Sequence, residues 1–419
     1  MCSSDLVPGF TRRIELRALH HFLSLKHVPH PLTIFKDVFI LPPAHRLVFR
    51  PGHELDLKRY WDIDFSVDEA TASQPEEVIV DEVLRLLKQG VRRRLMSDVP
   101  IGFFLSGGLD SSLSTALAAE MCGTIKTFTL AYSSASTTPG KDADRQWAQW
   151  TASRYATEHH EETIAFTNYP DRLREILACF DEPFAGVVSS YFLSQLIARH
   201  VKVAMSGDGA DEIFGSYLSH RLAQPLANFD QYLQSGDAAL IRPFESRPGY
   251  LATLLADARG DAGWRAKLLV YQEHEKLSLY HPDVAEAVAG ERTEDLLRDR
   301  FDTLSARDPL NRILEAECRT IFPDQVLTYV DRLSMAHSLE VRSAYLDTDL
   351  VTFVARLPGR LKIKAGTTKY LLKQAARRYF PAEMVDRRKE GFLMPVTNWL
   401  LGDLRPYVRE DRKSTRLNS

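Results

Sequence analysis

The segment Ser106–Ser112, which reads SGGLDSS, contains the residue types of a phosphate-binding loop. It follows the apolar run Val99–Leu105, which predicts a buried strand, and it precedes a helical pattern that we expect Asp110 to cap near Ser111. Glycines let the backbone approach an anion closely, and the N–H groups at a helix N-terminus point toward it. The serine hydroxyls add donors, and Asp110 supplies a carboxylate for a phosphate-bound Mg²⁺. The segment therefore predicts a phosphate site between a strand and a helix, although a tight turn with purely geometric glycines is the alternative.

A second polar cluster follows the apolar run Val201–Met205, which also predicts a strand. The next ten residues read SGDGADEIFG and carry carboxylates at Asp208, Asp211 and Glu212. Parallel sheets bind their ligands beyond the carboxyl ends of the strands, which is where this cluster is expected. By itself the cluster is equally consistent with a solvated acidic loop that leads into a helix. Its functional interpretation therefore rests on the other motifs of the chain.

Further segments give the two clusters a context. DRLSMAHSLEVR stands at 331–342, YLD at 345–347 and RRKEGF at 387–392. The first cluster resembles the SGGxDS loop of the ATP pyrophosphatases, which split ATP between its α and β phosphorus atoms, and it lacks the Lys-Ser/Thr ending of a Walker loop. In their order and spacing, all these segments resemble the synthetase domain of glutamine-dependent asparagine synthetases. The resemblance runs from about Val7 to about Val408.

The resemblance implies a site for ATP and Mg²⁺. The loop Ser106–Ser112 would hold the pyrophosphate, and the residues beside it would cradle the adenosine. Asp110 and Asp211 would bind Mg²⁺. The nucleotide-binding residues implied in this way are Leu105, Ser106, Gly107, Gly108, Asp110, Ser111, Ser112, Leu130, Ser206 and Gly207.

The resemblance also implies catalytic residues. Lys389 would be the cation that faces the α-phosphate; the alternative is a solvated lysine in a basic run, but the Gly391-Phe392 that follows favours the catalytic role. Asp208 stands where most relatives carry a glutamate linked to adenylate formation, so its shorter side chain places the charge differently. Glu340 could orient the substrate or form a structural bridge with Arg342.

This chain also contains an acidic pair that matches a pair of carboxylates in the relatives only in part. Asp142 and Asp144 stand where the relatives carry two carboxylates near the nucleotide. The segment 133–140, an insertion before the pair, blurs this match.

The implied reaction is the ATP-dependent synthesis of asparagine from aspartate. The side-chain carboxylate attacks the α-phosphorus, pyrophosphate leaves, and ammonia, free or from glutamine, then displaces AMP from the β-aspartyl-adenylate. Charge gathers on phosphate oxygens in the transition state, so N–H donors, Mg²⁺ and a cation are required.

Two other functions stay open at this point. The same chemistry could act on another carboxylate, as in an amidotransferase of polysaccharides or a cyclase that forms a β-lactam or a peptide ring. The chain could also bind a nucleotide without turnover. Enzymes of the same loop type that thiolate tRNA usually show catalytic cysteines or a basic surface, and neither pattern occurs here.

The composition narrows the classes of partner. The 419 residues carry 53 Lys and Arg against 56 Asp and Glu, for a net charge of −3, so the basic footprint of a nucleic-acid-binding protein is missing. No apolar run is long enough to span a bilayer. The four cysteines are scattered without the spacing of a zinc site, which favours a reduced, cytoplasmic enzyme. Small-molecule substrates are the expected partners, and a homodimer stays open.

The order of patterns predicts an α/β fold. Strands are expected near Val99–Leu105, Ile125–Ala131, Glu162–Phe166 and Val201–Met205. Helical patterns between them predict a parallel sheet covered on both faces, which the resemblance identifies as adenine nucleotide α-hydrolase-like. A further helix, which precedes the first strand, is expected to open with a capping box at residues 73–76. The chain should be helical from about Leu218 to Phe322 and again beyond Tyr345.

The resemblance also predicts the domain organisation. Residues 1–65 resemble the end of an α+β glutaminase domain, and residues 75–410 form the synthetase domain. Segments 1–6 and 411–419 can be reverse-translated into sequencing-adapter sequence, so we expect them to be non-native. Cys2 then imitates a catalytic N-terminal cysteine without its motif, and the chain should use free ammonia and not glutamine.

Overall fold

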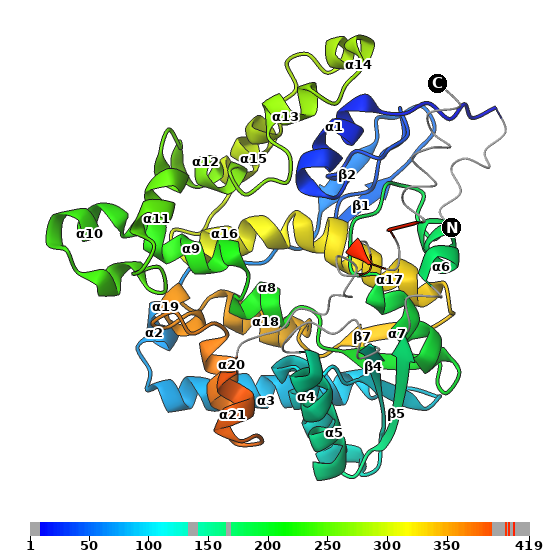
Figure 1. Ribbon diagram of the computed structural model, residues 1–419, viewed down its shortest axis with the longest axis vertical. Helices are drawn as coiled ribbons and strands as arrows, with labels where there is room; N and C mark the ends of the chain where they lie inside the picture. The colour runs from blue at the N-terminus through cyan, green and yellow to red at the C-terminus, as the bar shows by residue number, and fades with distance from the viewer. Residues whose placement is uncertain are drawn as a thin grey trace.

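A five-stranded parallel sheet lies at the centre of the computed structural model, which describes residues 9–132, 141–164, 169–387, 399, 401–402 and 405–406 (Figure 1). The strand order is β5-β4-β3-β6-β7. The bounds are β3 (Ile101–Phe104), β4 (Lys126–Tyr132), β5 (Glu158–Ile164), β6 (Val203–Ser206) and β7 (Glu340–Ser343). All four pairings are parallel, which confirms the predicted α/β class with a parallel sheet.

The four predicted strands all occur in the structure, but the ends of one of them differ from the prediction. Three of the four expected strands match within two residues at each end. The strand expected at Glu162–Phe166 begins earlier, at Glu158, because the charged residues 158–162 lie on an edge strand that only β4 pairs with. Strand β7 was not predicted, because its sequence EVRS lacks an apolar run and it is held in the sheet by pairing with β6.

Helices cover both faces of the sheet (Figure 1). Phe103 and Met205 share one core cluster, which includes residues of α3 (Glu76–Arg94), α4 (Leu109–Cys122), α18 (Thr348–Ala355) and α20 (Tyr370–Ala376). Phe128 and Ala204 share another, which includes residues of α7 (Ser189–Ala198) and α17 (Thr328–Met335). Adjacent strand residues point to opposite faces, so the central strands β3 and β6 contribute to both clusters.

A helical part follows the sheet region, as the sequence predicts. It has a core of its own around Trp264, Phe301 and Leu314. Its helices are α9 (Leu218–Ala227), α10 (Phe229–Ser235), α11 (Pro248–Leu255), α12 (Gly260–Ala266), α13 (Glu273–Leu277), α14 (Pro282–Ala287), α15 (Thr293–Asp302) and α16 (Pro309–Cys318). The other helical elements are α2 (Glu69–Ala72), α5 (Lys141–Arg154), α6 (Tyr169–Leu177), α8 (Ala210–Phe214), α19 (Gly359–Lys362), α21 (Ala382–Asp386), the 3-10 turn Ala238–Ile241 and the π-helix Phe322–Leu327.

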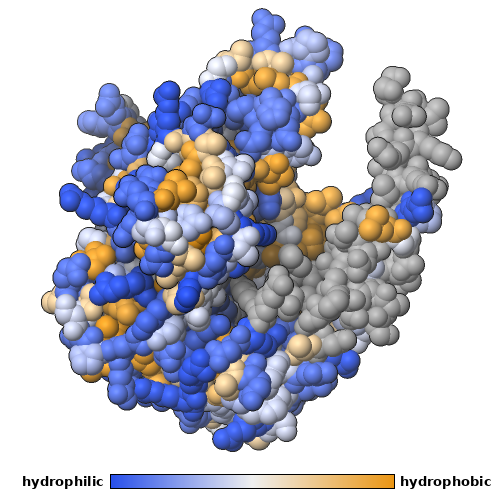
Figure 2. All heavy atoms as spheres, turned by 60° about the vertical axis from the view of Figure 1, so that its left-hand side comes forward, coloured by the Kyte–Doolittle hydropathy of each residue, from blue (hydrophilic) through white to orange (hydrophobic). Residues whose placement is uncertain are grey.

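The N-terminal segment packs against this helical part. It contains α1 (Leu16–Leu25) and an antiparallel hairpin of β1 (His45–Val48) and β2 (Asp56–Arg59). Helix α1 lies beside α13 and α15 in Figure 1, where the His21 Nδ1 atom is 3.0 Å from the Thr293 hydroxyl. Figure 2 shows a recess on this side of the molecule with apolar side chains exposed inside it. Within the described ranges, no helix has the length and apolar character that a membrane span requires.

Two predicted helix caps are wrong. Helix α4 begins at Leu109 with Gly108 as its N-cap, so Asp110 lies in the first turn and does not cap the helix. Helix α3 begins at Glu76 after Pro75, without a capping hydrogen bond from a side chain, because Ser73 ends the short helix α2 instead. In both places the Asp or Ser that sequence rules favour as a cap has another role in the structure.

A buried amide joins the N-terminal segment to the sheet region. Asn311 on α16 is fully buried, and its Nδ2 atom donates to the carbonyls of Phe65, Ala355 and Leu357 at 3.1, 3.3 and 3.1 Å. Its Oδ1 atom accepts from the Nζ atom of Lys362, also fully buried, at 2.6 Å. This one side chain therefore satisfies four buried polar groups from three segments.

We expect Asn311→Ala to lower the free energy of unfolding by about 2–4 kcal/mol, because the carbonyls of Phe65 and Leu357 lose their side-chain donor and Lys362 keeps only the Ala355 carbonyl. Urea unfolding followed by circular dichroism measures the change. The exposed amide variant Gln231→Ala should stay within about 0.5 kcal/mol of the parent chain. Equal stabilities of the two variants would contradict this role of Asn311.

Candidate active site

The segment Ser106–Ser112 forms the predicted turn between β3 and α4. The Ser106 and Ser111 hydroxyl oxygens are 3.0 Å apart, the backbone N–H of Gly108 donates to Ser106 Oγ at 3.3 Å, and Ser111 Oγ donates to the Gly108 carbonyl at 3.2 Å. Ser112 is fully buried, and its hydroxyl has no partner among the described residues. The serines therefore shape the loop around the start of α4.

A neighbouring helix requires glycine in this loop. Gly107 has φ +76°, and a Cβ atom there would lie 1.9 Å from the carbonyl oxygen of Asp144 on α5. Arg387, at the end of α21, donates from Nη2 to the Gly107 carbonyl at 2.8 Å and to Asp144 Oδ1 at 2.6 Å. Arg387 therefore ties together the loop, α5 and the segment that leads to Lys389. The sequence placed Arg387 only in a basic run, and Lys389 itself lies outside the described residues.

The second polar cluster lies directly beside the first. Ser206 ends β6, the strand that pairs with β3, and a Cβ atom on Gly207 would lie 3.1 Å from the Cβ atom of Asp110. Asp208 accepts a hydrogen bond from the Ser206 hydroxyl at 2.7 Å. The two predicted loops thus meet at the carboxyl ends of β3 and β6, as expected for a ligand site of a parallel sheet.

A lysine that the sequence analysis missed joins the two predicted Mg²⁺ ligands. The Nζ atom of Lys369 is 2.6 Å from Asp110 Oδ2 and 2.6 Å from Asp211 Oδ1, and its side chain is only 5% exposed. Burial opposes the charged form of Lys369, but the two carboxylates outweigh it and hold its pKa above the usual range. Lys369 precedes α20, about 160 residues beyond Asp211, and no local pattern marks it as buried.

The acidic pair fits a magnesium ion. Asp110 Oδ1 is buried and has no hydrogen-bond partner among the described residues, which is unusual for a carboxylate oxygen. Mg²⁺ takes oxygen ligands and often binds through one or two carboxylates together with substrate phosphates. In the described part of the chain, no three His, Cys, Asp or Glu side chains gather as a metal cluster. Asp110 and Asp211 therefore suit an ion that arrives with phosphate groups.

Glu212, next to Asp211, is a buried acid of the site region. Its side chain is 3% exposed, and the Tyr217 hydroxyl donates to Glu212 Oε1 at 2.6 Å. Burial raises the pKa of Glu212 to about 7, and the neighbouring Asp211 adds to this shift. The sequence analysis gave Glu212 no role.

A chain of hydrogen bonds supports Asp211 from the helical part. The Ser216 hydroxyl donates to Asp211 Oδ1, and the backbone N–H of Ser216 donates to His220 Nδ1 at 2.9 Å. His220 Nε2 therefore carries the proton and donates to Glu317 Oε2 at 2.9 Å, while Arg265 Nε donates to Glu317 Oε1 at 3.2 Å. These contacts connect α9, α12 and α16 to the acidic pair.

The structure does not bring every predicted residue to the loop. Glu340 starts β7 level with Val203, at the amino end of the sheet, and binds Arg342 Nε at 2.7 Å. This geometry supports the structural bridge with Arg342, and the catalytic role of Glu340 stays a prediction. Leu105 and Leu130 are both buried but belong to different core clusters, so their shared contact with adenosine stays a prediction.

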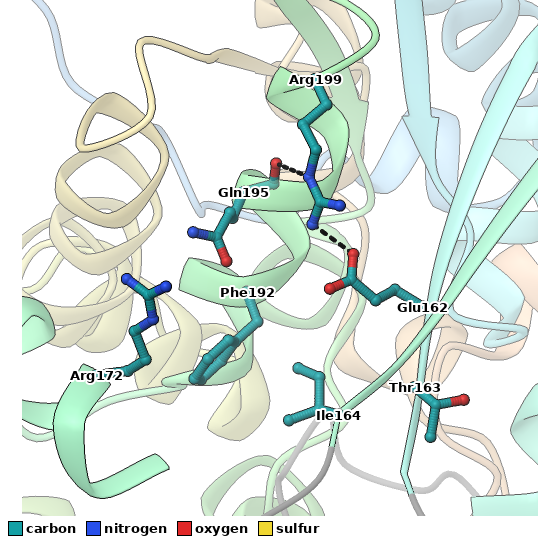
Figure 3. A pocket seen from close by; sticks show the side chains of 7 residues that line it. All are labelled: Glu162, Thr163, Ile164, Arg172, Phe192, Gln195 and Arg199. Atoms are coloured by element: carbon teal, nitrogen blue, oxygen red, sulfur yellow. Dashed lines mark hydrogen bonds and ion pairs between the residues drawn. The ribbon is translucent and has the colours of Figure 1, made fainter. Parts of the chain in front are cut away.

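A cavity of about 480 Å³ lies at the carboxyl-terminal part of the edge strand β5, and no residue of either loop lines it (Figure 3). It is lined by Glu162, Thr163, Ile164, Arg172, Phe192, Gln195 and Arg199. Its two arginines are already paired, Arg199 with Glu162 at 2.5 Å and Arg172 with Glu175 at 2.6 Å. The cavity contains none of the predicted site residues.

Comparison with known proteins identifies related sequences. The family model described as Asparagine synthase matches residues 82–419. The glutamine-hydrolysing asparagine synthetase 1 of Bacillus subtilis (strain 168) is 29% identical over 420 residues, 94% of this chain and 62% of that protein. A protein named as an amidase, from Penicillium rubens, is 26% identical and covers 90% and 62%. The chain thus spans about three fifths of these relatives. A solved NH3-dependent NAD synthetase from Campylobacter jejuni matches 43% of this chain and 96% of that one at 13% identity, with a TM-score of only 0.23.

We expect Lys369→Met to lower the free energy of unfolding by about 3–5 kcal/mol without nucleotide or Mg²⁺, because two largely buried carboxylates lose their shared cation. Lys364→Met is the matched control, since Lys364 forms an exposed pair with Glu76 that is worth less than about 1 kcal/mol. Urea unfolding of both variants measures the difference. A Lys369→Met variant as stable as the control would show that the cation is not needed there.

Proposed function

The chain belongs to the asparagine synthase family, and we propose from this and from its site that it is an ATP-dependent ligase that turns a carboxylate into an amide. The observation that carries the proposal is the meeting of the glycine loop with Asp110, Asp211 and Lys369 at the carboxyl ends of β3 and β6. A glycine loop at a helix start, two carboxylates and a cation suit the phosphates of a nucleotide with its metal.

We propose aspartate as the carboxylate and asparagine as the product. The support is that relatives along most of this chain are named glutamine-hydrolysing asparagine synthetases. Asp208, where the family usually has glutamate, keeps a negative charge beside the loop, held by the Ser206 hydroxyl. The nucleophile that forms the amide is ammonia, which is either supplied free or released from glutamine.

The first half-reaction activates the carboxylate. An oxygen of the aspartate side chain attacks the α-phosphorus of ATP, and the bond between this phosphorus and the bridging oxygen to the β-phosphorus breaks, so pyrophosphate leaves. Backbone N–H groups at the start of α4 and the hydroxyls around them hold the pyrophosphate, and Lys389 neutralises charge at the α-phosphate. Mg²⁺ held by Asp110 and Asp211 would supply further positive charge to the departing phosphates.

The second half-reaction forms the amide. Ammonia attacks the carbonyl carbon of the β-aspartyl-adenylate, AMP leaves with the electron pair of the C–O bond, and the nitrogen loses a proton. The burial of Lys369 keeps Asp110 and Asp211 at fixed positions throughout, so the site is organised before the phosphates arrive. Arg387 has a similar role for the loop carbonyl of Gly107.

A different carboxylate is the second candidate. The relatives include proteins named as amidases from fungi, which cover 90% of this chain. The shorter side chain at Asp208 also changes the position of a charge next to the loop. ATP–pyrophosphate exchange with aspartate, glutamate and larger carboxylates, tested one at a time, separates the two candidates. Exchange that depends on aspartate supports asparagine synthesis, and exchange only with another acid supports the second candidate.

We expect Asp110→Asn to lower aspartate-dependent ATP–pyrophosphate exchange by about two to three orders of magnitude. The change keeps the shape of the side chain and removes the charge that would hold Mg²⁺, and Lys369 keeps Asp211 as a partner. The exposed Asp230→Asn on α10 is the control and should exchange normally. Exchange at the parent rate in Asp110→Asn would rule out this carboxylate as a metal ligand.

Lys389→Ala should lower amide formation by about 10²–10³-fold with ATP binding largely retained, because the cation acts on charge that develops in the transition state. Asparagine formation by chromatography and ATP affinity by calorimetry measure the two effects. Lys58→Ala, which removes an exposed lysine of β2, is the control. Normal product formation in Lys389→Ala would mean that this lysine is only a solvated member of its basic run.

A further inference from the structure

A second cavity, of about 140 Å³, lies between the N-terminal segment and the helices α12, α15 and α16. Its walls come from residues 24–29 on one side and from residues 265–270, 296–301 and 316–325 on the other. All of these residues belong to the described part of the chain. The cavity is separate from the phosphate loop, because no residue of that loop lines it.

His27, which lines one wall of this cavity, carries a buried acceptor without a donor. His27 is 5% exposed, and its Nδ1 atom is 3.1 Å from the carbonyl oxygen of Leu25. A carbonyl can only accept, so Nδ1 carries the proton and Nε2 keeps its lone pair. Nε2 is buried and has no partner among the described residues. Burial lowers the pKa of His27 to about 4, so the ring is neutral at pH 7.

The opposite wall carries two arginines that use only part of their N–H donors. Arg300 on α15 donates from Nη2 to the His30 carbonyl at 2.6 Å and forms no ion pair with the described residues. Arg265 uses only Nε, toward Glu317 at 3.2 Å, which leaves its terminal nitrogens available. Glu317 is the one carboxylate among the described lining residues, and His220 occupies its other oxygen at 2.9 Å. The cavity therefore has excess positive charge and unused N–H groups.

The remaining surface is apolar. Leu268, Leu297 and Phe301 are among the side chains that line it. A volume of about 140 Å³ exceeds the roughly 30 Å³ that one water molecule occupies in the liquid, but it is smaller than the ~300 Å³ or more of drug-sized sites. A fitting molecule is therefore small, with an anionic group, an adjacent hydrogen-bond donor and a short aliphatic body.

We propose that this cavity binds a small aliphatic acid with a donor on its α-carbon, an α-amino or α-hydroxy acid. The carboxylate contacts the terminal nitrogens of Arg300 and Arg265, the α-substituent donates to His27 Nε2, and the aliphatic chain packs against Leu297 and Phe301. Such a ligand satisfies the unused polar groups on both walls at once. The site goes beyond the proposed ligase activity and does not depend on it.

The position of the cavity also links it to the acidic pair. Arg265 holds Glu317, and Glu317 holds His220, whose other nitrogen accepts from the backbone N–H of Ser216. The Ser216 hydroxyl then donates to Asp211. A ligand carboxylate on the terminal nitrogens of Arg265 thus binds the same guanidinium whose Nε atom holds the far end of this chain of contacts.

Calorimetric titration of the chain with L-valine, with its α-hydroxy analogue and with isovalerate tests the proposal. Isovalerate has the same carbon skeleton without the donor, so at least one of the other two should bind about tenfold more tightly. Tighter binding of L-valine identifies an amino-acid site, and tighter binding of the analogue identifies a hydroxy-acid site. If neither binds more tightly than isovalerate, the proposal is wrong.

Variants then locate the binding. Arg300→Gln should lower the affinity for the better ligand by at least about tenfold. Arg298 is an exposed arginine of the same helix that pairs with Asp295, so Arg298→Gln should leave this affinity unchanged. His27→Phe keeps a buried ring and removes Nε2, so it should abolish the preference over isovalerate even if Arg300→Gln does not fold. Unchanged preference in His27→Phe, or equal effects of the two arginine variants, would overturn the proposal.

Discussion

The contact of Lys369 with Asp110 and Asp211 is the interaction on which the rest of the site depends. The two carboxylates lie in the first turns of different helices, α4 and α8, which follow neighbouring strands of the sheet. In a largely buried setting their repulsion is strong, and a cation between them removes it. The sheet brings the two helix starts together, and Lys369, at the start of α20, holds them at hydrogen-bond distance. The helical part reaches the same acids through Ser216 and His220.

The loop beside these acids depends on close backbone contacts. Gly107 leaves room for the α5 carbonyl of Asp144, and Gly207 leaves room for the start of α4. Arg387 then fixes the Gly107 carbonyl and the Asp144 carboxylate with one guanidinium. A phosphate-binding loop needs this order, since its N–H groups bind an anion well only when they are already in place. The residues that touch the phosphates are thus held by residues from several distant segments.

The sequence predicted the parts of this site that are local. A strand, a glycine turn and a helix leave a pattern within about twenty residues, so both loops, the parallel sheet and the acids Asp110 and Asp211 could be placed. Lys369 and the partners of Arg387 could not, because a lysine or arginine carries no local mark of the carboxylate that it meets in the folded chain. Strand β7 was missed for a similar reason, since it exists through pairing with β6. The motif around Glu340 gives its position in the chain but not its place on the sheet, which the pairing of β7 with β6 supplies.

The central claim is that this site transfers an adenylyl group to a carboxylate. Aspartate labelled with ¹⁸O in its side-chain carboxylate, incubated with ATP, Mg²⁺ and ammonia, tests it directly, because the attacking oxygen stays on the phosphorus when ammonia displaces AMP. Mass spectrometry of the nucleotide and phosphate products locates the label. The account predicts one ¹⁸O atom in AMP for each asparagine formed and unlabelled pyrophosphate. Label in inorganic phosphate together with ADP, or asparagine formed without labelled AMP, would contradict it.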